Sequence, residues 1–84
     1  MSIRILYFAS LREALGQGSE ELALPAGIAT LEGLRSHLAA RGEPWAALAR
    51  TKNLRAAINQ SMAGAQAPVK DGDEIAFFPP VTGG

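Results

Sequence analysis

Apolar residues recur with the two-residue period of a strand near both ends of the chain. Residues 3–8 and 74–78 are short runs rich in β-branched and aromatic side chains, and we expect a strand in each. Residues 20–24 alternate less regularly and are followed by Pro25, which predicts a second strand that stops there. Residues 55–60 predict one more strand before the last one.

The middle of the chain has the period of a helix. Thr30 is a good N-cap, and the leucines that follow at positions 31, 34 and 38 share one helical face. The pattern ends at Arg41 and Gly42, where the glycine favours a helix C-terminus. This segment is therefore predicted to be the main helix, with its leucine face packed on the sheet.

Shorter elements connect these segments. Ser10 is expected to cap a short helix over residues 11–15, and Pro44 to lie in the first turn of another, whose tryptophan closes one end of the core. Residues 61–68 are expected to form an irregular turn. The sequence Asp71-Gly72-Asp73 is typical of a tight turn before the last strand.

This order of strands and helices predicts an α+β fold. A helical crossover between two hairpin-like halves brings the first and last strands together in the centre of a mixed sheet, where they run parallel. One main helix packs across that sheet, which is the arrangement of a β-grasp, or ubiquitin-like, fold. We expect residues 1–78 to form this domain and residues 79–84 to be an extended, flexible C-terminal tail.

The first strand carries apolar side chains on both of its faces. Ile3, Ile5 and Tyr7 point to one side, and Leu6 and Phe8 point to the other. One of these faces belongs to the core, which leaves the other as a candidate contact surface.

The C-terminal segment cannot join a helix or the interior of the sheet. It consists of Pro79, Pro80, Val81, Thr82, Gly83 and Gly84. Consecutive prolines lack backbone donors and hold the backbone extended, so six residues reach roughly 20 Å. The two glycines have no Cβ and fit a channel too narrow for other residues. The alternative to a tail that enters another protein is a chain end that has no function.

Composition and charge exclude several kinds of chemistry and partner. The 84 residues include no cysteine, which excludes a thiolate metal site and a thioester on this chain. Eight basic and eight acidic residues cancel, and the arginines are dispersed, so nucleic acid is not an expected partner. No apolar stretch approaches the ~18 residues needed to span a bilayer, so we expect a cytoplasmic protein without membrane contact.

Three features have parts of a catalytic or ligand-binding motif but fit simpler roles. Gly16 and Gly18 lack the third glycine of a dinucleotide loop, and His37 has no second ligand at metal spacing. Asp71 and Asp73 fit a turn better than a metal site. The terminal carboxylate is therefore the group on which chemistry can be placed.

The C-terminal sequence Asp71-Gly72-Asp73-Glu74-Ile75-Ala76-Phe77-Phe78-Pro79-Pro80-Val81-Thr82-Gly83-Gly84 resembles that of the MoaD family, the small, sulfur-carrying subunits of molybdopterin synthase. The segments Ile5-Leu6-Tyr7-Phe8-Ala9, Leu11-Arg12-Glu13 and Ala57-Ile58-Asn59-Gln60 agree as well, so the resemblance covers essentially the whole chain. The Phe-Pro-Pro-Val-x-Gly-Gly ending is specific, whereas a bare Gly-Gly is not.

The resemblance implies a chain whose Gly84 carboxylate is adenylated, converted to a thiocarboxylate and used as the sulfur donor for the dithiolene of the molybdenum cofactor. An ATP-dependent activating enzyme would consume the ATP, and this chain would bind no cofactor or metal. The sulfur acceptor would be bound by the large subunit of molybdopterin synthase, in a heterotetramer of two small and two large subunits. The catalytic residues would lie on the large subunit, and this chain would be a non-catalytic donor. The part inserted into the partner would be Gly83 with Pro79, Pro80, Val81 and Thr82.

The resemblance also implies where the chain docks. Phe8, Met62 and Phe78 match family positions that form a hydrophobic patch against the large subunit, although all three could be ordinary core residues. We therefore expect Phe8 and Phe78 to be more exposed than Ile5 and Phe77.

Two other functions share this fold and this ending. One is a sulfur carrier of another pathway, such as thiazole biosynthesis, against which the Phe-Pro-Pro-Val sequence argues. The other is a ubiquitin-like modifier, which would use the same adenylate and transfer the chain to lysine amines of target proteins.

Overall fold

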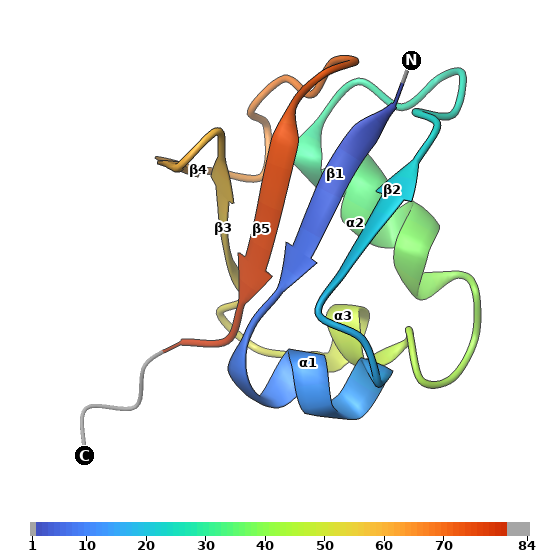
Figure 1. The fold of residues 1–84 in the computed structure, drawn as a ribbon, viewed down its shortest axis with the longest axis vertical. Helices are drawn as coiled ribbons and strands as arrows, with labels where there is room; N and C mark the ends of the chain where they lie inside the picture. The colour runs from blue at the N-terminus through green and yellow to red at the C-terminus, as the bar shows by residue number, and fades with distance from the viewer. Residues whose placement is uncertain (1, 81–84) are drawn as a thin grey trace.

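The sheet has the predicted mixed topology with a parallel central pair. The computed structural model describes residues 2–80, and in this part of the chain five strands form one sheet in the order β2-β1-β5-β3-β4 (Figure 1). At its centre, β1 (Ile3–Tyr7) runs parallel to β5 (Glu74–Phe78). The antiparallel neighbours are β2 (Ser19–Leu22) on β1, β3 (Arg55–Ile58) on β5, and β4 (Ser61–Ala63) on β3.

The main helix is α2 (Leu31–Ala39), which lies across one face of the sheet (Figure 1). Its leucine face is buried, as the period of the sequence indicated. The hydroxyl of Thr30 accepts a hydrogen bond from the backbone N–H of Gly33 at 3.1 Å, so the predicted cap is confirmed. The sheet and this helix together make the predicted α+β, β-grasp fold.

The hydrophobic core lies between α2 and the sheet. Its largest fully buried side chains are Tyr7, Phe77, Ile3, Ile5, Leu34, Leu38, Leu48 and Ile75. Burying a side chain of this size stabilises a fold by roughly 1.5–3 kcal/mol. The face of β1 that carries Ile3, Ile5 and Tyr7 is therefore the core face.

The predicted starts of the two short helices are wrong. Ser10 does not cap α1 (Ala9–Leu15), because the chain leaves β1 through the extended N-cap residue Phe8 and enters the helix at once. Ala9 makes this change of direction with a φ of 54°. Similarly, α3 (Ala47–Arg50) begins after Pro44, whose carbonyl accepts from the N–H of Ala47 in a separate turn at 3.1 Å.

The prediction of an irregular turn over residues 61–68 is wrong at its start, where β4 pairs with β3. The strand predicted over residues 55–60 also ends earlier, at Ile58. Asn59 and Gln60 have φ values of 51° and 71°, and Ile58 is paired with Ser61. This is the geometry of a two-residue hairpin turn with positive φ at both central positions.

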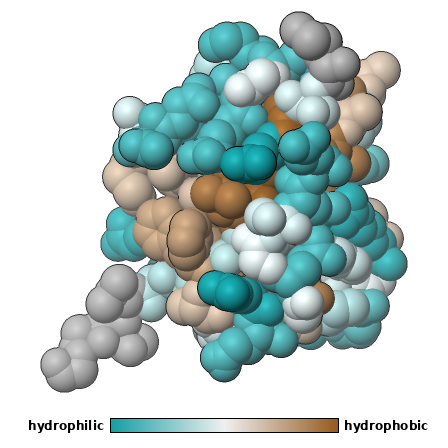
Figure 2. All heavy atoms as spheres, in the orientation of Figure 1, coloured by the Kyte–Doolittle hydropathy of each residue, from teal (hydrophilic) through white to brown (hydrophobic). Residues whose placement is uncertain are grey.

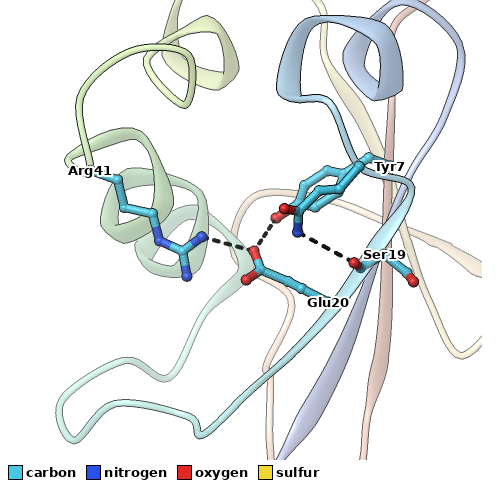
Figure 3. Close-up of polar contacts among 5 residues, drawn as sticks. Tyr7, Ser19, Glu20 and Arg41 are labelled. Carbon is cyan, nitrogen blue, oxygen red and sulfur yellow. Dashed lines mark hydrogen bonds and ion pairs between the residues drawn. The ribbon is translucent and has the colours of Figure 1, made fainter.

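A polar cluster connects β1 and β2 to the loop after α2 (Figure 3). The hydroxyl of Tyr7 donates to Glu20 Oε1 at 2.8 Å, and Nη1 of Arg41 donates to the same oxygen at 2.9 Å. The guanidinium of Arg41 also lies 4.6 Å from the ring centroid of Trp45, and that ring is 5.7 Å from the ring of Tyr7. Burial, followed by the hydrogen bond to Glu20, raises the pKa of Tyr7 far above its ordinary value, so its hydroxyl stays a neutral donor.

The Tyr7→Phe variant is expected to lower the free energy of unfolding by about 1 kcal/mol, because it removes one hydrogen bond and keeps the aromatic packing. Glu20 retains Arg41 as a partner in this variant. Urea unfolding followed by the fluorescence of the single tryptophan, Trp45, measures the change. An unchanged midpoint would show that this hydrogen bond makes no net contribution to stability, because water donates to Glu20 in place of the hydroxyl.

Candidate functional site

The predicted tail begins where the central strand β5 ends. Phe78, Pro79 and Pro80 are partly buried at this end of the sheet. The other predicted tail residues, Val81, Thr82, Gly83 and Gly84, lie outside the described residues. The described structure thus places the base of the tail next to both strands that flank β5.

The sheet face opposite α2 carries an apolar surface, which we call the open face. The strand register aligns Leu6, Ala76, Ala57 and Met62 in one row across β1, β5, β3 and β4. Phe8 and Phe78 follow Leu6 and Ala76 by two residues, so they lie on the same side of the sheet, nearer the start of the tail. Figure 2 shows this side of the molecule, where apolar side chains gather between hydrophilic regions. The open face is defined by Leu6, Phe8, Ala57, Met62, Ala76 and Phe78.

Two large apolar side chains of the open face are strongly exposed. Met62 is 63% exposed and Phe8 is 46% exposed, whereas Ile5 is 0% and Phe77 is 1% exposed. Phe78 is partly buried. The predicted difference between the outward and the core-facing residues is confirmed, and the role of the outward residues in binding stays a prediction.

The backbone between β1 and α1 keeps Phe8 on the open face. Phe8 remains extended, with a φ of −122°, and its N–H donates to the carbonyl of Phe77 at 3.2 Å. The chain then turns away at Ala9 into α1. Phe8 therefore continues the alternation of β1 beside β5 without being covered by α2.

A second set of hydrogen bonds fixes the hairpin that carries Met62. Asn59 donates to Asp73 Oδ1 at 2.9 Å and accepts from the N–H of Glu74 at 3.0 Å. Asp73 Oδ2 accepts from the N–H of Lys70 at 2.9 Å. The backbone hydrogen bond from Lys70, helped by Asn59, holds the pKa of Asp73 below its ordinary value despite burial. The predicted turn role of Asp73 is confirmed, and it joins the start of β5 to the β3–β4 turn.

Among residues 2–80 there is no cluster of three or more histidine, cysteine or acidic side chains that could hold a metal ion. His37 is exposed on α2, as predicted for a surface position. Within the same part of the chain, no helix is long and apolar enough to cross a membrane.

A pocket of about 190 Å³ lies between α2 and the β3–β4 hairpin. Its charged residues are engaged in hydrogen bonds within the fold: Arg35 donates to the carbonyls of Leu48 and Thr51 at 2.7 and 2.9 Å, and Glu32 accepts from Gln66 at 2.8 Å. Apart from these two charged residues, the pocket is lined by apolar residues and glycine.

Sequence reasoning identified the large residues of the open face and missed the small ones between them. Ala57 and Ala76 join the face only through the pairing of β3 with β5. Alternation within each strand could have placed them on an outward face. Their position between Leu6 and Met62, however, depends on a register that alanine residues do not reveal.

Comparison with known proteins agrees with this geometry. Residues 5–84 match the ThiS family. The molybdopterin synthase sulfur carrier subunit of Escherichia coli is 46% identical over 82 residues, covering 98% of this chain and 99% of that protein. The subunit of the same name from Haemophilus influenzae is 45% identical, with the same coverage.

Among solved structures, small archaeal modifier protein 1 of Haloferax volcanii has a TM-score of 0.78 and 26% identity, with full coverage of both chains. Its likeness extends over the whole β-grasp body. The chain therefore belongs to the ThiS family, and the resemblance to molybdopterin synthase sulfur carrier subunits that its sequence indicated is confirmed.

Proposed function

We propose that this chain is the sulfur carrier of a molybdopterin synthase and donates sulfur from a thiocarboxylate at Gly84. The observation that carries the proposal is the 46% identity, over nearly the full length of both chains, to a protein named as that subunit. The sequence Phe77-Phe78-Pro79-Pro80-Val81-Thr82-Gly83-Gly84 supplies the required end. The apolar open face beside the tail base supplies a surface on which partners can dock.

The chemistry explains why the chain needs a free carboxylate and no catalytic side chains. A carboxylate is a poor acyl electrophile, so the Gly84 oxygen first attacks the α-phosphorus of ATP and releases pyrophosphate. The terminal sulfur of a persulfide donor then displaces AMP from the acyl-adenylate, and a thiol reductant cleaves the S–S bond of the resulting acyl disulfide. The product is a thiocarboxylate, a soft nucleophile that is ionised at neutral pH. The activating enzyme catalyses these steps, and this chain supplies the reacting carbon.

The partner in the sulfur transfer is the large subunit of the synthase, in an assembly of two small and two large subunits. The thiocarboxylate sulfur attacks a cyclic pyranopterin monophosphate held there. Water then cleaves the bond between the sulfur and the Gly84 carbonyl carbon, so that the sulfur stays on the pterin and the chain leaves with its carboxylate restored. The acid–base groups belong to the large subunit. A cytoplasmic location, which the sequence led us to expect, would supply the ATP for the activation step. The narrow residues of the tail suit insertion into a channel, while the open face sets the position of the body.

The test is the intact mass of the chain after incubation with an activating enzyme, ATP, a persulfide donor and a thiol reductant. The expected result is a mass gain equal to the exchange of one oxygen atom for sulfur, followed by loss of that gain when the large subunit and the pterin precursor are added. Absence of any gain, under conditions that convert the Escherichia coli subunit, would refute the proposal.

The Phe8→Ala variant is expected to weaken binding to the large subunit by at least about tenfold, because exposed aromatic residues at the centre of an interface carry much of its energy. The affinity can be measured by titration calorimetry. Ala26→Asp is a matched control, since Ala26 is exposed in the turn between β2 and α2, away from the open face. Equal affinities of the two variants would exclude the open face as the docking surface.

A second function, protein modification, is supported by the likeness to small archaeal modifier protein 1. In this case the acyl-adenylate would be transferred to a lysine amine. The tagged chain expressed in its own cells would then form conjugates of higher mass that resist reducing agents. Their absence, together with a thiocarboxylate on the free chain, would favour sulfur transfer alone.

A further inference from the structure

Two arginines lie on the same side of the sheet as the open face, but their surroundings differ. Arg4, in β1, is directly opposite Glu21 of β2 and directly opposite Glu74 of β5. Directly opposite residues on antiparallel strands, such as Arg4 and Glu21, lie about 5 Å apart at their Cβ atoms, close enough for opposite charges to stabilise each other. Arg4 therefore has a carboxylate residue beside it on each neighbouring strand, although among residues 2–80 it forms no ion pair with either.

Arg55 has no such partner in the sheet. It is exposed at the start of β3, directly opposite Phe78 of β5. Two residues further along β3, on the same face, is Ala57. Among residues 2–80, Arg55 forms neither an ion pair nor a side-chain hydrogen bond. It is therefore a single cation at the edge of the apolar open face, on the side from which the tail leaves.

We infer that Arg55 is a specificity-determining contact, which pairs with a carboxylate of the large subunit when that subunit covers Phe78. This inference rests on the proposed function. When a partner covers Phe78, it also removes water from the neighbouring side chain of Arg55. Desolvating an unpaired guanidinium is costly. A partner with an aspartate or glutamate at this place compensates the cost, whereas an apolar or basic surface is rejected.

The experiment compares two matched neutral variants, Arg55→Gln and Arg4→Gln, in binding to the purified large subunit at low and high NaCl. Arg55→Gln is expected to weaken binding about tenfold at low salt and to flatten the salt dependence. Arg55→Lys should retain most of that salt dependence because it keeps the charge. Arg4→Gln should change the affinity by no more than about twofold. Thermal unfolding checks that all variants are folded.

The outcomes separate this inference from the proposed function. If Arg55→Gln and Arg4→Gln bind alike at every salt concentration while Phe8→Ala still weakens binding, the inference is wrong and the docking surface stands. A weaker Arg55→Gln complex with unchanged salt dependence would show that the aliphatic stem matters and the charge does not, which also overturns the inference. If the unmodified chain does not bind the large subunit, both fail together.

Discussion

Deletion of Gly84 is expected to abolish thiocarboxylate formation while the body remains folded and still docks. The deletion moves the carboxylate back by one residue, about 3.3 Å, and a reacting atom displaced by that distance no longer meets the catalytic groups of the activating enzyme. Intact mass after incubation with activating enzyme, ATP and sulfur donor should show no exchange of oxygen for sulfur.

Two controls make this result specific to the chain end. A chain with one serine added after Gly84 has the same body and both glycines, but its carboxylate is displaced outward, and it should also fail to gain sulfur. Binding of both variants to the large subunit through the open face should persist, although weaker without the proper tail contacts. Sulfur gained by the deletion variant would disprove the assignment of Gly84 as the reactive residue.

The Asp73→Ala variant is expected to lower the free energy of unfolding by about 3 kcal/mol. Its buried carboxylate accepts from the Lys70 N–H and from Asn59, and its removal leaves both donors without that partner. For a small domain this is a large share of the total stability. Urea unfolding at pH 7 gives the value, with Asp71→Ala as the control, since Asp71 is exposed in the same turn.

The stabilisation by Asp73 should also depend on pH, with a definite sign. Its pKa in the folded chain lies below the ordinary aspartate value of 3.8, mainly because of the backbone hydrogen bond from Lys70. The stabilising contribution is therefore fully present above that value and is lost as the pH falls through the lower, folded pKa. The difference between wild type and Asp73→Ala should shrink in acid. A difference that stays constant from pH 7 to pH 3 would contradict this explanation.

The overall topology could be predicted because its strongest signals are local. The strand at each end and the helix capped by Thr30 have clear periods, and chain connectivity then leaves few arrangements, of which the parallel central pair is one. The β4 strand was missed because Ser61, Met62 and Ala63 include no β-branched residue and owe their extended form to pairing with β3. The cap at Ser10 failed because the backbone changes direction one residue earlier, at Ala9.

The large residues of the candidate site could be predicted from the sequence, but the residues around them could not. Phe8 and Met62 stand out in the sequence through the family resemblance, and the structure finds both exposed. The contrast between Arg4 and Arg55 could not be predicted, because it depends on which residues oppose them in neighbouring strands. Cross-strand neighbours are set by register, and a single sequence specifies register weakly at short strands.

The central place of β5 also has a mechanical consequence. The strand is hydrogen-bonded to β1 on one side and to β3 on the other. A pull applied beyond Phe78 acts along the strand axis and across these bonds, so both ladders resist together in shear and do not open one bond at a time. An edge strand would have only one ladder to share the load. The sheet thus anchors the end of β5, from which the tail leaves, through two sets of hydrogen bonds at once.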